Sequence, residues 1–507
     1  TRRMAPTLVN VVDLKLFETT NSSTLSQGLN FQPGVRVETN CQNCGFQQVR
    51  INGLDGPYTQ ILIDSRPVFS ALSGVYGLEQ IPASMIERVE VMRGGGSALF
   101  GSSAIAGTIN IITKEPLRNS GQLSHTITSL GGSSSFDNNT SLNASLVTDD
   151  HRAGLYIFGQ NRYRSGYDYG GDGFTELPKL KNQTVGFRSY LKTSTYSKLT
   201  FEYHHMQEFR RGGDMLNRPP HEAHIAEQLQ HSIDGGSLKF DYFSPDEKNR
   251  LSVFASAANT DRDSYYGPGN DPLKAYGKTT DLTAMGGAQY VHTFDKCFFM
   301  PSDLTAGLEY NRDRLKDNMW GYNRHTDQTV NIYSAFLQNE WKNDRWGILI
   351  GGRLDKHNMV DNVIFSPRAN LRFNPTQNIN LRLSYSSGFR APQAFDEDMH
   401  IENVGGTVAM IERAKDLKEE KSQSFSVSAD MYHRFGAFQT NLLIEGFYTR
   451  LTDVFVLGEP YDRGDGILVK TRSNGPGAKV MGLTLEGKVA YLSILQIQAG
   501  LTLQRSR

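Results

Sequence analysis

The segment VMRGGGSALFGSSAIAGTINIITKEP, residues 91–116, decides the fold. It starts at the end of a short apolar strand, passes through Arg93 and a glycine cluster, and closes on a second strand, TINIIT. Glycines placed this densely permit tight turns and close approach of neighbouring backbones. The segment therefore predicts a compact small domain that packs inside a larger structure.

A nucleotide-binding loop is the rival interpretation of these glycines. The spacing from Gly94 to Gly101 gives neither a Walker A motif nor a G-x-G-x-x-G that opens a long amphipathic helix. A phosphate cradle is therefore disfavoured.

The composition is typical of many strands that are apolar on one face and wet on the other. Only 38% of the chain is hydrophobic, yet 22 Tyr and 27 Phe are spread throughout. Lys and Arg balance Asp and Glu at 53 each, so a general attraction to nucleic acid has no support. No run of 18 apolar residues occurs, which excludes a helical membrane protein but not a transmembrane barrel, whose strands need about 9–11 alternating residues.

Three cysteines are present, and two of them form the pair CQNC. This spacing fits a redox pair, half a metal site or a local disulfide. We expect a disulfide between Cys41 and Cys44 in an oxidising compartment, with Cys297 left over. The chain opens at Thr1 without an export signal, which we interpret as removed or left out.

Residues 1–116 predict a mixed α/β unit. A strand is expected in APTLVNVVDLKLFE, residues 5–18, and a short helix capped near Asn21 and stopped by Pro33. Further strands are expected at 48–53 and 59–67, and IPASMIERVEVM, residues 81–92, predicts a turn of helix that leads into a strand.

After Pro116 the side chains alternate with period two, the pattern of a strand with two different faces. We count eighteen such strands, and the last three are ILVKTRS (467–473), VMGLTLEGKVAYL (480–492) and LQIQAGLTLQR (495–505).

Short turns alternate with long loops between these strands. The long loops are expected at 163–183, 206–234, 259–280, 312–330, 354–364 and 391–421. Consecutive hairpins of this kind place all short turns at one rim and all long loops at the other, as in outer-membrane barrels. A soluble propeller or tandem sandwich is the alternative, but no repeat of 40–50 residues is present and the strands are too long for blades.

Two segments of the first domain resemble the plug signature of TonB-dependent outer-membrane receptors. They are VRINGLDGPYTQILIDSRPV (49–68) and IPASMIERVEVMRGGGSALFGSSAIAGTINIITK (81–114). In the second domain SYSSGFRAPQAFDE (384–397) resembles the family's FRAP segment, whereas KDLKEEKSQSF (415–425) lacks the Asn-Pro that the family usually has there.

The resemblance implies a mixed α/β plug domain, residues 1–116, inside a large antiparallel transmembrane β-barrel, residues 117–507. The family has 22 strands, so our count of eighteen suggests that the last strands lie outside this sequence. No segment that resembles a TonB box is found, so we expect the TonB box to lie outside it as well. Such receptors bind a scarce nutrient too large for porins and import it to the periplasm when TonB pulls on the plug. The resemblance thus implies a Gram-negative outer-membrane protein that is not an enzyme and has no cofactor or metal. TonB and outer-membrane lipid are its expected partners, and a surface lipoprotein is a further candidate.

By the same resemblance, the apical loops 41–48 and 69–80 of the plug contact the ligand. The candidate residues offer amide, hydroxyl and aromatic groups: Gln42, Asn43, Phe46, Gln47, Phe69, Ser73 and Tyr76. Glu87, Glu90 and Arg93 are the charged set beside the glycines, and we expect them to dock the plug against the wall, because an unpaired buried charge is costly.

Histidines gather outside the plug, at His204, His205, His221, His224, His231 and His400. A haem receptor could use such side chains as axial ligands, and His221, His224 and His400 are the candidates. The expected ligand is an iron complex (haem or siderophore) or a corrinoid, with copper and glycan receptors as weaker alternatives. A CxxC redox enzyme and a passive porin or adhesin barrel are the hypotheses from other classes.

Overall fold

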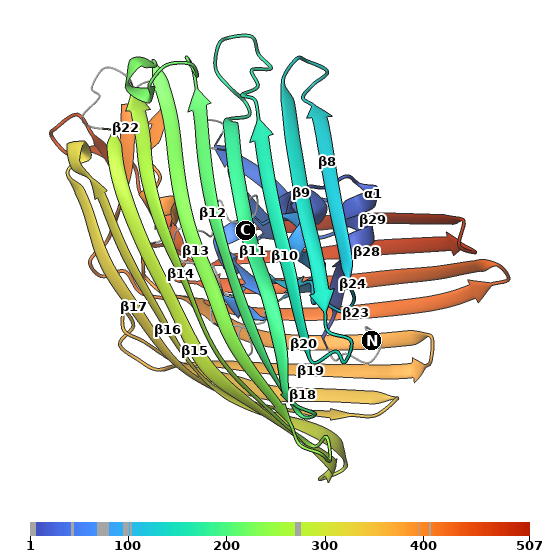
Figure 1. Cartoon of the computed structure of the whole chain (residues 1–507). Coiled ribbons are helices and arrows are strands. Elements are labelled where there is room, and N and C mark those ends of the chain that lie inside the picture. Colours follow the sequence, from blue (N-terminus) through green and yellow to red (C-terminus); the bar gives the residue numbers. More distant parts are fainter. Residues whose placement is uncertain are drawn as a thin grey trace.

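The computed structural model describes residues 7–41, 45–67, 81–94, 101, 104–268, 275–394, 396–404 and 407–507. Within them, a small α/β unit lies inside a wall of long antiparallel strands, seen in blue behind the wall in Figure 1. No described helix is long and apolar enough to cross a membrane.

The inner unit is built on a five-stranded sheet with the strand order β1-β6-β7-β4-β5. Its strands are β1 (Val9–Asp13), β4 (Thr59–Ile63), β5 (Arg66–Pro67), β6 (Ile86–Arg93) and β7 (Gly107–Thr113). A separate hairpin consists of β2 (Val35–Cys41) and β3 (Phe46–Ile51). The helices are α1 (Leu14–Thr19), α2 (Leu25–Leu29) and the 3-10 turns η1 (Gly56–Tyr58) and η2 (Ala83–Met85).

Local chemistry explains where these elements start and why the glycines are needed. The prediction of a continuous strand at 5–18 was wrong in its second half, because the Asp13 carboxylate accepts the Leu16 N–H and starts α1. Gly107 pairs with Arg93, and a Cβ there would lie 2.4 Å from the Met92 carbonyl oxygen. Gly94 has φ +79°, a conformation that favours glycine.

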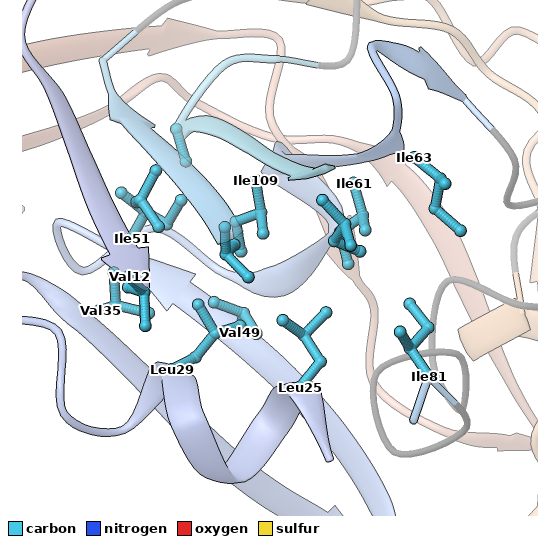
Figure 2. Close-up of a cluster of buried hydrophobic side chains, with 14 of the residues drawn as sticks. Val12, Leu25, Leu29, Val35, Val49, Ile51, Ile61, Ile63, Ile81 and Ile109 are labelled. Carbon is cyan, nitrogen blue, oxygen red and sulfur yellow. The ribbon is translucent and has the colours of Figure 1, made fainter. Parts of the chain in front are cut away.

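The core of the inner unit is aliphatic and continues into the wall. Figure 2 shows Val12, Leu25, Leu29, Ile51 and Ile109 converging between the sheet and α2. Wall side chains complete the same cluster: Tyr156, Phe158, Phe447, Leu451 and Val480. The unit therefore shares its hydrophobic core with the barrel.

Among the described residues, seventeen strands form the barrel wall, and backbone pairing joins each to the next wall strand along the chain. They are β8 (Ser120–Ser129), β9 (Phe136–Val147), β10 (Ala153–Arg164), β11 (Lys179–Ser194), β12 (Ser197–Gly213), β13 (Ile225–Phe243), β14 (Asn249–Pro268), β15 (Tyr276–Cys297), β16 (Met300–Met319), β17 (Arg324–Lys342), β18 (Trp346–His357), β19 (Ile364–Thr376), β20 (Ile379–Arg390), β23 (Glu420–Phe435), β24 (Phe438–Thr452), β28 (Ala478–Tyr491) and β29 (Leu495–Ser506).

One of the eighteen predicted strands, ILVKTRS, is not part of the wall. Its residues form most of β27 (Leu468–Asn474), which pairs in parallel with β22 (Thr407–Arg413) at the loop rim. This small sheet also contains β21 (Glu402–Val404), β25 (Phe455–Leu457) and β26 (Tyr461–Asp462), and α5 (Asp396–Met399) lies close to β22. Alternation alone does not distinguish a wall strand from a strand of a loop sheet.

The wall strands bury their polar faces and expose their apolar ones. On β9, Asn139 and Ser141 are buried while Leu142 and Leu146 are exposed. This is the reverse of a soluble strand, and it suits a wall with lipid outside and a polar lumen inside.

The long loops are shorter than the sequence predicts because the strands extend into them. β15 is 22 residues long, well beyond the roughly 9–11 residues needed to cross a membrane. The loop expected at 206–234 is reduced to residues 214–224, which include the 3-10 turn η3 (Pro220–Glu222). Between β16 and β17 only η4 (Trp320–Tyr322) and Asn323 remain.

The loops pack on one another through a second apolar cluster. It joins side chains from five connections: Ala223, Ala226, Leu229, Tyr265, Tyr266, Ala275, Met319, Tyr322, Ile401, Met410 and Ile467. Hydrogen bonds connect the loops of this cluster. Tyr322 donates to the Tyr266 carbonyl at 2.7 Å, and Arg463 donates to the Tyr322 carbonyl at 2.8 Å. The loop rim is therefore a packed structure rather than a set of separate loops.

Candidate functional site

The plug loops expected to contact a ligand lie mostly outside the described residues. Gln42, Asn43, Phe69, Ser73, Tyr76 and Cys44 are all in this group. Cys41 ends β2 and Phe46 begins β3, and the disulfide expected between Cys41 and Cys44 lies outside the described residues. Gln47 is half-buried in β3, and the Gly45 carbonyl just before this strand accepts a hydrogen bond from Arg210 of β12 at 3.4 Å.

The histidine candidates contact different neighbours. His221 Nδ1 lies 2.9 Å from the Tyr276 hydroxyl, and His224 Nδ1 lies 2.6 Å from an Asp214 oxygen. His400 Nε2 lies 3.5 Å from Glu227, with its ring against Tyr266. Among the described residues, the one group of three or more potential metal ligands is Asp168, Asp172 and Glu176, which contains no histidine. The structure thus does not bring the three histidines together around one centre.

A cavity of about 800 Å³ opens among the loops at the rim. It is lined by the start of β17, the β18–β19 and β20–β23 connections, β22 and Arg463. Its charged lining is predominantly basic: Arg324, Arg413, Lys415 and Arg463, with His325, against Asp398 and Glu412.

Two of these cations have no carboxylate within ion-pair distance among the described residues. Arg413 donates to the Gln328 side chain and to the Pro392 carbonyl, both at 3.0 Å, and Lys415 is exposed. In contrast, Arg324 pairs with Asp317 at 2.9 Å and Arg463 with Asp465 at 2.6 Å. Burial lowers the pKa of Arg413, an effect that Asp398 partly offsets, so the cavity favours an added anion.

Arg93 lies in a fully buried ionic contact between the plug and the wall. Its Nη2 is 2.9 Å from Glu445 of β24 and 2.7 Å from Glu486 of β28, and the three side chains are 1–3% exposed. Asn10 donates to Glu486 at 3.2 Å, and Arg93 Nη1 donates to the Pro33 carbonyl at 3.0 Å. We call Arg93, Glu445 and Glu486 the Arg93 cluster.

The two glutamates predicted beside Arg93 have other surroundings. Glu90 accepts from Arg88 at 2.9 Å and from Asn110 at 3.3 Å, and both partners belong to the plug. Glu87 is exposed, on the same strand. The hydrogen bonds of Glu90 are thus within the plug, and the docking role expected of Glu87 and Glu90 stays a prediction.

A second ionic cluster, which the sequence did not indicate, lies at β11 and β12. Arg188 Nη1 is 2.6 Å from Asp64 of the plug and 2.7 Å from Glu202 of the wall, and its Nη2 is 3.3 Å from Glu115. Arg188 also donates to Thr113, whose hydroxyl donates to Asp64 at 2.6 Å. We call Arg188, Asp64 and Glu202 the Arg188 cluster.

A third contact joins Tyr58 to the wall. Its hydroxyl donates to Glu420 of β23 at 2.9 Å, and the Arg390 guanidinium lies 5.9 Å from the ring centre. Burial, followed by the Glu420 carboxylate, raises the pKa of Tyr58 well above its ordinary value of 10.0, so the hydroxyl remains a donor at neutral pH.

The barrel holds the plug through buried ionic contacts, and a basic cavity opens among the loops above it. This combination is typical of plugged receptors of the outer membrane. Family models agree with this class: one described as "TonB-dependent Receptor Plug Domain" matches residues 1–108, and one described as "TonB dependent receptor-like, beta-barrel" matches residues 105–507. The chain belongs to the TonB-dependent receptor family and is a protein of the Gram-negative outer membrane. Members of this family are receptors and transporters rather than enzymes.

Curated relatives match over short stretches. The chain is 37% identical to the vitamin B12 transporter BtuB of Vibrio vulnificus over 103 residues, which are 20% of this chain and 17% of that protein. It is 36% identical to the ferric enterobactin receptor of Pseudomonas aeruginosa over 107 residues, 18% of this chain and 14% of that protein. The matched stretches thus span less than a fifth of these relatives.

Solved structures match over nearly the whole chain and show the fold. The ferric enterobactin receptor PfeA aligns with a TM-score of 0.81 at 19% identity, over 99% of this chain and 81% of that chain. The siderophore receptor PirA of Pseudomonas aeruginosa aligns with a TM-score of 0.78 at 16% identity, over 98% and 85%.

Proposed function

We propose that this protein captures an anionic ferric siderophore outside the cell and imports it to the periplasm when TonB pulls on the plug. In this proposal residues 1–116 are the plug, residues 117–507 belong to the barrel, and the protein performs no chemistry on its cargo. A tight external site is useful for import only if work applied from inside later disrupts it.

The observation that supports an anionic cargo is the excess of cations in the loop cavity. Arg413 and Lys415 have no carboxylate partner among the described residues, although the other cavity arginines are paired. Ferric catecholates carry negative charge, and guanidinium groups bind planar anionic oxygens well. The ferric enterobactin receptor among the relatives is consistent with this cargo.

A corrinoid is the second candidate. The uncharged polar plug loops predicted at 41–48 and 69–80 would suit it, and a vitamin B12 transporter is among the relatives. Haem has less support, because His221 and His224 each contact a separate neighbour.

Docking of the plug is the role that we propose for Arg93. Its guanidinium meets two buried wall carboxylates, which would be left uncompensated if the plug withdrew. The roles of Glu87 and Glu90 in docking, and of the apical loop residues in ligand contact, remain predictions.

Ligand binding can be measured by tryptophan fluorescence. Trp320 is 57% exposed beside the cavity-lining residues 323–326, so a bound coloured complex would quench its emission. We expect saturable quenching by ferric enterobactin and weaker or no quenching by cyanocobalamin and haemin. Binding of cyanocobalamin alone would replace the siderophore proposal with the corrinoid one.

The variant Arg413→Gln tests the cavity directly. Loss of one charge-assisted contact is expected to weaken ferric enterobactin binding about tenfold. Arg218→Gln is the matched control, because Arg218 is an exposed loop arginine outside the cavity lining. Equal affinity in the two variants would place the ligand elsewhere.

A further inference from the structure

The outward face of β23, β24, β28 and β29 combines an apolar groove with a row of cations. Glu445 and Glu486 point inward to Arg93, so the residues that alternate with them point outward. The strand registers then place Tyr448 beside Phe425 and Met481, and Gly446 beside Val427 and Leu483, in two outward rows.

These two rows contain an apolar groove of about 670 Å³. Phe425, Tyr448, Met481, Leu483 and Leu503 line it. The hollow exists because Gly446 lacks a side chain: a Cβ there would meet only Val427, at 3.5 Å. The groove is therefore open and apolar, as an acyl chain requires.

Next to the row that contains Phe425, Tyr448 and Met481, on the side of the loop rim, lies a row of cations. Arg450 is the cross-strand partner of Lys479, and Arg505 is the partner of Met481 in the next row. Lys479 and Arg507 exchange two backbone hydrogen bonds. Like charges in directly opposite positions destabilise a sheet. Among the described residues, no carboxylate lies within ion-pair distance of Arg450, Lys479 or Arg505, so these cations lack a protein counterion.

A second groove of about 620 Å³ lies beside the first, on β19, β20, β23 and β24, and Arg450 is part of its lining. It is more polar, and Tyr385, Lys421, Gln423 and Arg450 are among its lining residues. The end of β24 and the starts of β23 and β28 lead into the rim that carries β22 and β27. The cations thus lie at the extracellular end, where headgroups of the outer leaflet are found.

We propose that this face is a binding site for a phosphorylated glycolipid of the outer leaflet. Its phosphate groups neutralise Arg450, Lys479 and Arg505, and an acyl chain lies over Gly446 in the apolar groove. Basic side chains beside an apolar surface bind anionic lipid headgroups in other membrane proteins. The proposal does not depend on nutrient uptake, because Gly446, Lys479 and Arg505 lie on the outward face of the wall, opposite to the face that carries Glu445 and Glu486.

The test is native mass spectrometry of the full chain released from nanodiscs that contain lipid A, phosphatidylglycerol or phosphatidylcholine. We expect one lipid A to be retained and the two phospholipids to dissociate. The triple variant R450Q/K479Q/R505Q is expected to bind lipid A about a hundredfold more weakly, since each basic group near the surface contributes roughly one kcal/mol. Equal retention of lipid A and phosphatidylglycerol would overturn the commitment to a glycolipid.

Two further variants separate a site from general charge. K181Q/K278Q/K316Q removes three exposed lysines near the loop rim on β11, β15 and β16, and lipid A binding should be unchanged. Gly446→Leu fills the apolar groove without altering charge and should weaken binding severalfold. The proposal would be overturned if the control variant K181Q/K278Q/K316Q lost lipid A binding. It would also be overturned if both R450Q/K479Q/R505Q and Gly446→Leu bound lipid A as tightly as the wild type. Heat-modifiable migration on gels verifies that each variant is folded.

Discussion

Two of the ionic clusters between the plug and the wall differ in burial. In the Arg93 cluster all three side chains are 1–3% exposed. In the Arg188 cluster the corresponding values are 13% for Arg188, 14% for Asp64 and 19% for Glu202, and the neighbouring Glu115 is 37% exposed. Both clusters join plug to barrel, but only the second is reached by water.

This difference predicts different roles when the plug moves. Separation of a fully buried cluster leaves charges in a low-dielectric interior, which costs several kcal/mol. Separation of a partly hydrated cluster costs less, because water replaces the lost partner. We infer that the Arg93 cluster anchors the plug and that the Arg188 cluster is the contact that yields first.

The largest effect is expected for Arg93→Met. The substitution leaves Glu445 and Glu486 buried without their cation and should weaken plug docking by about 3–5 kcal/mol. Limited proteolysis of the plug in increasing urea measures the change.

Two further variants test the cause of this loss. Arg88→Met removes a plug arginine that is 43% exposed and pairs with Glu90, and it should leave docking nearly unchanged. Adding Glu445→Gln and Glu486→Gln to Arg93→Met should recover part of the loss. If the triple variant is no better than Arg93→Met alone, the uncompensated carboxylates are not the cause.

Arg188→Met is expected to have an intermediate effect. We predict a loss of about 1–2 kcal/mol in docking, between the values for exposed and buried pairs. Salt should reduce the difference between this variant and the wild type, because a hydrated cluster is screened. The same urea proteolysis at low and high ionic strength checks both points, and a salt-independent loss would contradict the comparison.

The smallest effect is expected for Tyr58→Phe, which removes the hydrogen bond to Glu420. The loss should be about 1 kcal/mol at neutral pH, because Glu420 also accepts the Phe455 N–H. The pKa of Tyr58 is raised in the docked state, so its contribution is complete below pH 10 and declines above it, where the released tyrosine ionises. The variant should lack this alkaline decline, and docking measured from pH 8 to 11 tests it.

The fold could be predicted because its signals are local. Period-two alternation located all seventeen wall strands, and IPASMIERVEVM gave the helical turn η2 and β6 as expected. The strand ILVKTRS was misassigned to the wall, since β27 has the same alternation and only tertiary pairing with β22 distinguishes it. The loops were overestimated because polar residues continue the strands beyond the membrane, where neither face needs to be apolar.

The candidate site was less predictable because its contacts are distant in sequence. Arg93 stood out beside its glycines, but Glu445 and Glu486 carry no local signal. Asp64 and Arg188 are 124 residues apart, and nothing in either segment indicates the other. The uncompensated charge of Arg413 also depends on which loop carboxylates pair with other arginines, which only the packed rim determines.

The central claim is that the barrel is closed by a docked plug and opens only when the plug is displaced. Conductance of the wild-type protein in planar lipid bilayers tests it most directly. We predict no steady pore in the wild type and transient openings in urea, at a lower urea concentration for Arg93→Met. A large, stable pore in the untreated wild type would contradict the account and indicate a passive channel.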